Sequence, residues 1–277
     1  MKLAGGAHSV HSLAHGETFH PVVGPTAEAE ALYVRQLHLT ERLREPGEFV
    51  VWDIGLGAAA NPITFLRAAR GIPSVLRIVS FDHTLEPLKF ALGHKQYLPH
   101  LADYEPALRE LLARREVIFN NGAQQVSWVM RLGDFPTLLA QTEARQWPKP
   151  HAIMFDAFSP ATNPAMWTHP VFYGIFRLLD PERPCALPTY SRSTMLRVTL
   201  LLAGFFVGAG HPTGQKEETT VAANKTGLLE EPLDQRWLQR ARRSSSAEPM
   251  WEPVYRQARL STTSWEALQR HPQFRSV

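Results

Sequence analysis

The sequence predicts an α/β fold with a doubly wound, largely parallel sheet that closes in an antiparallel hairpin. Short runs rich in β-branched residues alternate with longer amphipathic stretches, which is the pattern of strands joined by crossover helices. A turn of glycine and alanine residues directly follows the first run. The last two runs are joined by a short turn instead of a helical stretch, so they predict a hairpin. A chain of 277 residues suits one large domain with extensions.

Several apolar runs predict buried strands. Each is short, rich in apolar residues and too brief for a buried helix. The runs are 49–54, 76–82, 126–134, 151–158 and 185–190. Cys185, the one cysteine of the chain, lies in the last run, so we expect a buried strand residue and not a nucleophile.

Amphipathic stretches predict the helices that cover the sheet. The expected helices are one through Phe65 and Ala69, which follows the glycine turn, and those at 86–96, 105–115 and 191–203. Two further runs, 205–210 and 217–223, predict the closing hairpin.

The closing hairpin separates two kinds of doubly wound sheet. It is typical of the Rossmann-like fold of class I methyltransferases, whereas dinucleotide-binding dehydrogenases usually continue with parallel units. The sequence therefore predicts a class I methyltransferase domain at 49–224. It also predicts an N-terminal arm at 1–48, which would cover the cofactor cleft, and a C-terminal extension at 225–277.

Composition and charge exclude several classes of protein. With 44% hydrophobic and 20% charged residues, the chain is typical of folded soluble proteins and not of disordered ones. The longest apolar stretch, 198–210, is too short to cross a bilayer, and the N-terminus resembles no signal peptide, so we expect a cytoplasmic protein without a membrane partner. The net charge of +3 does not by itself predict nucleic-acid binding. Arg240, Arg242 and Arg243 form a basic cluster that either meets phosphates or ends a solvated helix.

The turn after the first strand carries residues expected of a cofactor site. It reads DIGLGAAAN over 53–61, and Gly55 and Gly57 let the backbone approach a ligand closely. Asp53 suits the zwitterionic amino-acid end of S-adenosylmethionine, whereas it would repel a pyrophosphate. Charge thus favours S-adenosylmethionine over NAD, with Asn61 as a further cofactor-binding residue. A turn that only needs small residues is the alternative.

Acidic residues also end the next two strands. Asp82 can accept both ribose hydroxyl protons, and Asp134 is placed to reach an adenine amino group. Each acid alone could instead be a helix N-cap. One cofactor explains all three strand-end acids, Asp53 included, so we expect them to share it.

The segment after the fourth strand is expected to carry the chemistry. Methyl transfer to an amine needs a neutral nitrogen close to the methyl carbon and an acceptor for its proton, and Asp156 is placed for both. Phe158 follows on a proline-rich loop, where its ring can stack on a base. Trp167 and Tyr190 are further candidates for stacking, although each is also suited to the core.

The quoted segments carry a resemblance to one family. The chain resembles the S-adenosylmethionine-dependent methyltransferase domain of the bifunctional tRNA 5-methylaminomethyl-2-thiouridine biosynthesis proteins, and the stand-alone forms of that domain. The most specific segment is MFDAFSPATNPAMWT at 154–168. The others are HGETFHPVVGPTAEAEALYV at 15–34, WDIGLGAAAN at 52–61, VSFD at 79–82, LGD at 132–134 and AGFFVGAGHPTGQKEETTVA at 203–222.

The resemblance implies a substrate and residue roles. The substrate would be tRNA, methylated in its anticodon stem-loop on the primary amine of 5-aminomethyl-(2-thio)uridine at the wobble position. Asp156 would accept the proton, Phe158 would pack on the uracil, and Lys216 would lie near the substrate entrance. Glu17 to His20 would fold over the cofactor cleft, which gives the histidine-rich arm a role without a metal. A separate enzyme would supply the aminomethyl precursor.

The sequence departs from the family at two places, and three alternative functions stay open. Ala59 stands where relatives usually carry a third glycine, and close approach to the cofactor survives if its φ is negative. The turn at 211–215 replaces a more basic and glycine-rich stretch, which puts the grip on tRNA in question. The rivals are a methyltransferase for a small-molecule amine, a tRNA-binding relative without catalysis and, more distantly, an NAD-linked oxidoreductase.

Overall fold

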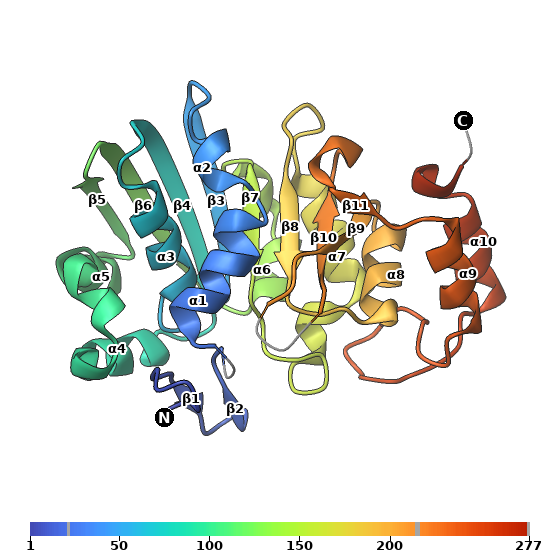
Figure 1. Ribbon diagram of the computed structural model, residues 1–277, viewed down its shortest axis with the longest axis horizontal. Coiled ribbons are helices and arrows are strands. Elements are labelled where there is room, and N and C mark those ends of the chain that lie inside the picture. The colour runs from blue at the N-terminus through green and yellow to red at the C-terminus, as the bar shows by residue number, and fades with distance from the viewer. Residues whose placement is uncertain (21–22, 214–216, 276–277) are drawn as a thin grey trace. The chain divides into compact units, whose positions relative to one another are not determined.

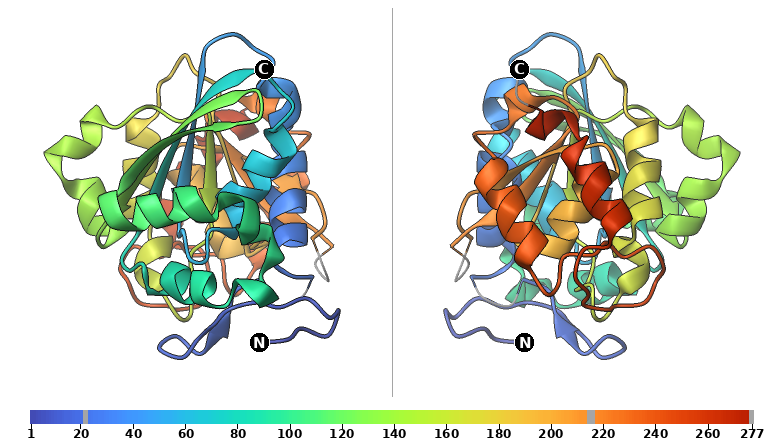
Figure 2. Two further views of the ribbon diagram at one scale, coloured as in Figure 1. Left: turned by 90° about the vertical axis from the view of Figure 1, so that its left-hand side faces the viewer. Right: turned by 90° about the vertical axis from the view of Figure 1, so that its right-hand side faces the viewer.

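The computed structural model describes residues 1–20, 23–213 and 217–275. The chain divides into two units of structure, shown as ribbons in Figures 1 and 2. Unit 1 comprises Met1–Phe135, Pro150–Asp156 and Pro212–Glu217, and unit 2 comprises Pro136–Lys149, Ala157–His211 and Glu218–Val277. The boundaries of these units differ from those of the predicted arm at 1–48, domain at 49–224 and extension at 225–277. That division of the chain stays a prediction.

Unit 1 contains the parallel part of the fold. Its strands follow the spatial order β7-β3-β4-β6-β5, with β5 antiparallel to β6 and the others parallel. The bounds are β3 Glu48–Ile54, β4 Ser74–Asp82, β5 Glu116–Asn121, β6 Gln124–Leu132 and β7 Ala152–Phe155. The carboxyl ends of β3, β4, β6 and β7 therefore share one edge of the sheet, which is where ligands bind in open α/β folds.

Helices and a small hairpin complete unit 1. Helix α3 packs against α1 and the π-helix that follows α1. The bounds are α1 Pro25–Ala29, the π-helix Glu30–Arg35, α2 Leu39–Arg42, α3 Ala60–Ala69, α4 Glu86–Gly93 and α5 Glu105–Arg114, with 3-10 turns at Lys95–Tyr97 and Pro99–Tyr104. The N-terminal strands β1 His11–Ser12 and β2 Glu17–Thr18 pair with each other.

Unit 2 is antiparallel. Its strands follow the order β11-β9-β10-β8. The strand bounds are β8 Ala186–Thr189, β9 Phe206–Gly210, β10 Thr219–Ala223 and β11 Glu231–Pro232. The helix bounds are α6 Phe135–Ala140, α7 His169–Leu178, α8 Thr194–Leu202, α9 Gln235–Arg243 and α10 Thr262–Gln269, with 3-10 turns at Thr142–Gln146, Pro164–Trp167, Thr226–Leu228 and Pro272–Phe274. The predicted closing hairpin is confirmed, because β9 and β10 pair antiparallel.

The core of unit 1 is built from the alternating large side chains of its strands. Trp52, Phe81 and Trp128 are fully buried, and the rings of Trp52 and Phe81 meet edge to face with centroids 5.7 Å apart. The Trp128 indole donates to Ser80 Oγ at 2.9 Å, so its one polar atom is satisfied in the core. In unit 2, Cys185 is buried as predicted, but it lies directly before β8 and not in a strand.

Two parts of unit 1 differ from the prediction. Strand β5 was not expected, and it pairs with β6 across a two-residue turn at Gly122 and Ala123. Gly122 has φ of 62°, and a Cβ there would come within 2.5 Å of the Arg70 carbonyl oxygen, so the turn requires glycine. The helix predicted at 86–96 ends at Gly93 and continues as the 3-10 turn Lys95–Tyr97.

Candidate functional site

The glycine turn lies at the carboxyl end of β3, as predicted. Gly55 and Gly57 have φ of 95° and 52°, a region that glycine occupies without strain. The Gly55 amide donates to the Phe81 carbonyl at 2.9 Å and ties the turn to β4. A Cβ on Gly57 would lie 3.0 Å from the Phe19 ring. The arm residue Phe19 therefore lies directly on the glycine turn.

Ala59 corrects one expectation. Its φ is 62°, not negative, and it directly precedes helix α3. A residue with a Cβ in this left-handed region carries a strain of roughly 1 kcal/mol. The turn therefore keeps the backbone path of a glycine-rich turn, and the surrounding structure offsets the strain at Ala59.

Asp53 is buried at the end of β3 and lacks one partner. The residue is 0% exposed, and Ser80 Oγ donates to its Oδ2 at 2.7 Å. Its Oδ1 has no hydrogen-bond partner among the described residues. Burial raises the pKa of Asp53 to about 7, with further increases from the charges of Asp156 and Asp82, while the Ser80 hydrogen bond opposes the shift. Such a carboxyl gains most from a cationic partner.

Asp82 at the end of β4 is tied to the glycine turn. Its Oδ2 accepts from the Gly57 amide at 2.9 Å and its Oδ1 from the Thr84 amide at 3.2 Å. His83 Nδ1 lies 3.2 Å from the same Oδ1, and this hydrogen bond is the main cause of a raised pKa at His83. The side chain of Asp82 therefore has a fixed position at the sheet edge.

Asp134 lies at the neighbouring strand end. The Gly133 amide donates to the Asp82 carbonyl at 2.9 Å, which joins the end of β6 to the end of β4. The Asp134 side chain is exposed. The structure thus places both acids at one edge of the sheet, as the sequence predicts.

Asp156 is held by residues far apart in the sequence. Asn61 Nδ2 donates to Asp156 Oδ2 at 2.8 Å, and His20 Nε2 lies 3.3 Å from the same oxygen. His20 Nδ1 in turn lies 3.8 Å from Glu28 Oε2. The side chains of His20, Glu28 and Asp156 are 8%, 14% and 19% exposed. Oδ1 of Asp156 has no hydrogen-bond partner within the described ranges. One carboxylate oxygen is therefore fixed, and the other is available to a substrate.

The main chain at Asp156 is also fixed. The Asp156 amide donates to the Ile54 carbonyl at 2.9 Å, and the Tyr33 hydroxyl donates to the Phe155 carbonyl at 3.0 Å. Tyr33 is 1% exposed, so this bond lies in the interior. Glu28 and Tyr33 were not predicted as site residues, although both lie in the segment 15–34 that carries the family resemblance.

The loop that follows Asp156 begins unit 2. The Trp167 indole donates to the Phe158 carbonyl at 2.7 Å, and the Tyr190 hydroxyl donates to the Ala157 carbonyl at 3.2 Å. Trp167 is buried and its ring meets Tyr190 edge to face. These two aromatics therefore support the loop backbone, while Phe158 itself is half-buried.

The structure does not bring every predicted residue together. Glu17 lies in β2, opposite Ser12, and no described bond joins it to Asp156 or Asn61. Lys216 lies outside the described residues. Among the residues that the structure describes, no group of three His, Cys, Asp or Glu side chains is arranged to hold a metal. Within the same ranges, no helix combines the length and apolar character that a bilayer-spanning segment needs.

The chain is similar to known methyltransferases in sequence and in structure. A family profile described as S-adenosyl-L-methionine-dependent methyltransferase matches residues 104–225. Proteins named tRNA 5-methylaminomethyl-2-thiouridine biosynthesis bifunctional protein MnmC are similar over most of the chain. The Pseudomonas putida protein is 27% identical over 246 residues, and the Ralstonia nicotianae protein is 28% identical over 249 residues. These alignments cover 83% and 87% of this chain and 35% of each relative.

The expected resemblance is confirmed. The chain spans about a third of the length of these MnmC relatives. The crystal structure of MnmC2 from Aquifex aeolicus matches 97% of this chain and 81% of its own chain, with a TM-score of 0.71 and 23% identity. The predicted class I methyltransferase fold is thus confirmed. The description of the matching profile agrees with the predicted enzyme class, a methyltransferase, and with the predicted cofactor, S-adenosylmethionine.

The polar groups at the strand ends of unit 1 fit S-adenosylmethionine. The unpartnered Oδ1 of Asp53 suits the ammonium group of the cofactor's amino-acid end, and Asn61 Oδ1 is a second buried oxygen without a partner among the described residues. Gly55 and Gly57 add no side chains of their own beside these oxygens, although the Phe19 ring lies on Gly57. Asp82 lies one strand away. An acidic set of this kind would repel a dinucleotide pyrophosphate.

Proposed function

We propose that this chain methylates the primary amine of 5-aminomethyl-(2-thio)uridine at the wobble position of tRNA, giving 5-methylaminomethyl-(2-thio)uridine. The observation that carries the proposal is Asp156, whose carboxylate is fixed at Oδ2 by Asn61 and His20 and left open at Oδ1. The names of the MnmC relatives support the choice of tRNA as substrate.

The strand-end residues would hold the cofactor. Asp53 would bind the ammonium group, Asp82 the ribose hydroxyls and Asp134 the adenine amino group, while Gly55 and Gly57 let the backbone approach. When bound, S-adenosylmethionine supplies an electrophilic methyl group on a sulfonium. The buried position of Asp53 makes it the strongest of these contacts, because an ion pair gains strength where water is excluded.

Asp156 would activate the substrate amine. An alkyl amine is protonated at neutral pH, and it must lose a proton before its lone pair can attack carbon. Oδ1 of Asp156 accepts that proton, while Asn61 and His20 hold Oδ2 in place. His20 lies between Asp156 and Glu28, at 3.3 Å and 3.8 Å, so its imidazole is oriented by an acid on each side. These contacts are in place before the substrate arrives, which lowers the cost of organising them during the reaction.

The remaining parts of the proposal concern substrate and surroundings. Phe158 would stack on the uracil, with its loop supported by Trp167 and Tyr190. The arm would cover the cofactor, as the contact of Phe19 with Gly57 supports, and Glu17 and Lys216 would lie near the substrate. The arm would extend over 1–48, the catalytic domain over 49–224 and the extension over 225–277. The chain would act in the cytoplasm on the anticodon stem-loop, on a primary amine that a separate enzyme supplies.

Nucleoside analysis tests the proposal. Purified protein and methyl-labelled S-adenosylmethionine are incubated with tRNA from cells that lack this activity, and the tRNA is then digested to nucleosides. We expect label in 5-methylaminomethyl-(2-thio)uridine alone. Label in another nucleoside, or none in tRNA while S-adenosylmethionine still binds, would overturn the proposed substrate.

A further inference from the structure

Helix α9 in unit 2 separates an apolar face from a basic one. The helix begins at the N-cap Asp234, whose Oδ1 accepts from the Trp237 amide at 2.8 Å. Trp237, Leu238 and Ala241 are buried, and the Trp237 ring stacks on Phe274 with a centroid distance of 6.3 Å. The helix sequence QRWLQRARR contains four arginines and no acid, so its exposed face is strongly basic.

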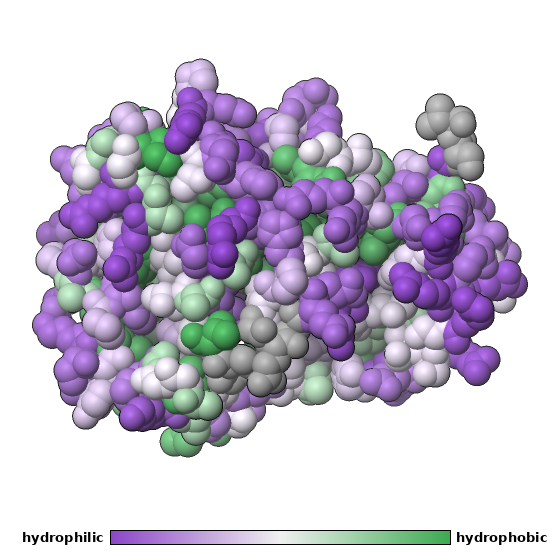
Figure 3. All heavy atoms as spheres, viewed as in Figure 1, coloured by the Kyte–Doolittle hydropathy of each residue, from purple (hydrophilic) through white to green (hydrophobic). Residues whose placement is uncertain are grey.

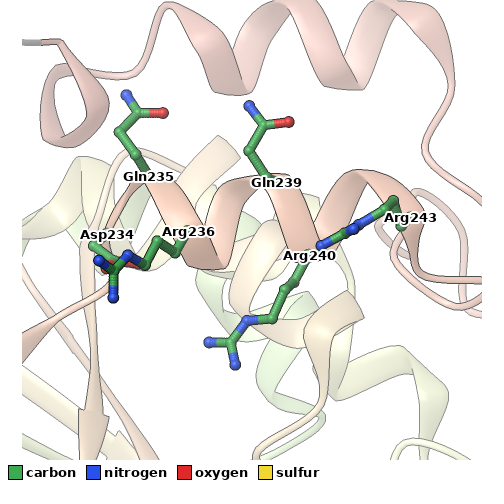
Figure 4. A pocket seen from close by; sticks show the side chains of 6 residues that line it. All are labelled: Asp234, Gln235, Arg236, Gln239, Arg240 and Arg243. Carbon is green, nitrogen blue, oxygen red and sulfur yellow. The ribbon is translucent and has the colours of Figure 1, made fainter.

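Three of these arginines line one hollow. Arg236, Arg240 and Arg243 follow each other at intervals of four and three residues, which places them on one face of a helix. They line an open hollow of about 730 Å³ together with Asp234, Gln235 and Gln239. Figure 4 shows the guanidinium groups of Arg236 and Arg240 extending from the same side of the helix. In the space-filling view, strongly hydrophilic side chains gather over α9 (Figure 3).

These arginines form no ion pair with any residue that the structure describes. Within the described ranges, no ion pair, hydrogen bond or ring contact involves Arg236, Arg240 or Arg243. Arg242 differs, because its guanidinium lies over the Trp265 ring at 4.8 Å. One acid, Asp234, also lines the hollow, and its Oδ1 accepts from the Trp237 amide as the helix cap. Three guanidinium groups against one carboxylate leave the hollow with a net positive charge.

The positive charge of the chain is concentrated in unit 2. Arg197 on α8 is buried beside Glu218, and burial lowers its pKa, with smaller decreases from the charges of Arg240 and Arg192. Counted by sequence, unit 2 has 15 Lys and Arg against 10 Asp and Glu, whereas unit 1 has 14 against 16. The basic excess of the chain thus lies in unit 2, and α9 carries much of it.

We propose that Arg236, Arg240 and Arg243 bind the phosphate backbone of tRNA. This inference rests on the proposed function for its choice of polyanion. Guanidinium groups bind phosphates with two parallel hydrogen bonds, and glutamine side chains such as Gln235 and Gln239 donate to phosphate or sugar oxygens. Among the described residues that line the hollow there is no aromatic side chain on which a base could stack. The contact therefore adds affinity and orientation, and base recognition is left to the catalytic site.

The test compares two triple variants of the full chain. The first, Arg236→Gln, Arg240→Gln and Arg243→Gln, removes the basic face. The second, Lys89→Gln, Arg109→Gln and Arg114→Gln, removes the same charge from α4 and α5, where each cation is paired with a glutamate. Affinity for tRNA is measured by fluorescence anisotropy between about 50 and 200 mM salt, a range in which phosphate contacts weaken strongly.

We expect the α9 variant to bind tRNA at least about tenfold more weakly than the wild type. Its plot of log affinity against log salt is expected to be shallower by about 2, because each lost phosphate contact contributes roughly 0.7–0.9 to the slope. The control variant is expected to keep the wild-type slope. Thermal melting of both variants checks that the fold is retained.

The remaining outcomes separate this inference from the proposed function. Equal losses in the two variants would overturn it, because net charge alone would then explain binding. An α9 variant that binds like the wild type, or a wild type that does not bind tRNA, would overturn it as well. Binding that depends on α9, without any methylation of tRNA, would support the phosphate site while the proposed reaction fails.

Discussion

Asp156 with its partners Asn61 and His20 in unit 1, and the basic face of α9 in unit 2, differ in how their charged groups are held. Asp156 is fixed by Asn61 and His20, and its position is set before any ligand binds. Arg236, Arg240 and Arg243 are exposed and have no partner among the described residues. A reacting group needs a fixed position, whereas a polyanion is attracted by charge at a distance. The difference indicates that the residues around Asp156 are suited to a reaction, and that helix α9 is suited to binding a polyanion.

The largest effect is expected at Asp156. Asparagine at this position keeps the shape of the side chain and loses the ability to accept a proton, so Asp156→Asn should reduce the methylation rate by about 10²–10⁴-fold. Affinity for S-adenosylmethionine should change little. Rates under saturating substrates and calorimetric titration measure the two quantities. A rate within about threefold of the wild type would remove Asp156 from the mechanism.

Asp53→Asn should weaken cofactor binding and stabilise the fold at high pH. Burial raises the pKa of Asp53 to about 7 from an ordinary 3.8. Between these values the native chain holds a proton that the unfolded chain has released, so this group lowers stability as pH rises, by up to roughly 4 kcal/mol above pH 7. Asparagine removes that dependence. Urea unfolding of both proteins at pH 5 and pH 8 should therefore show the variant gaining relative stability at pH 8.

The cofactor half of this prediction has its own pH dependence. Only the ionised carboxyl attracts the ammonium group, so wild-type affinity for S-adenosylmethionine should fall as pH decreases below about 7. The variant should bind weakly at both pH values. Equal affinity of the two proteins at pH 8 would contradict a cofactor contact at Asp53.

His20 is expected to have a smaller effect, because it acts through Asp156. His20→Gln retains an N–H donor near Asp156 Oδ2, whereas His20→Ala removes it. We expect a rate decrease of about tenfold for alanine and less for glutamine, with the KM for tRNA unchanged in both. Steady-state kinetics across pH 6–9 measures this. An equal loss in both variants would contradict a positioning role.

The smallest effect is expected at Ala59. Ala59→Gly relieves the strain of a positive φ but loses a buried methyl group and gains backbone entropy when unfolded, so stability should change by less than about 1 kcal/mol. Ala69→Gly is the matched control, since Ala69 is also buried but lies in a regular helix, and it should destabilise the protein by about 1–2 kcal/mol. Similar losses in both variants would contradict the left-handed conformation at Ala59.

The strand ends were predictable from sequence because their signals are local. Period-2 and apolar runs identify the strands, so Asp53, Asp82 and Asp134 are placed at one edge as soon as the sheet is taken to be parallel. Strand β5 was missed, although Asn121-Gly122 is a turn signal that could have identified its hairpin with β6.

The support of Asp156 was not predictable in the same way. Asn61 lies 95 residues before it, and His20 comes from the arm, so neither contact follows from a local pattern. The conformation of Ala59 was also missed, because alanine does not itself indicate a positive φ and the surrounding fold imposes it. Local periodicity predicts the strands and helices, whereas contacts between distant segments set the geometry around Asp156.

One measurement tests the central claim most directly, namely methylation of a pre-formed primary amine on tRNA. Two samples of the same tRNA are compared under single-turnover conditions, one with a free aminomethyl group at the wobble uridine and one with that amine acetylated. The account predicts transfer of one methyl group to the free amine and none to the acetylated sample. Equal incorporation into both samples would contradict it.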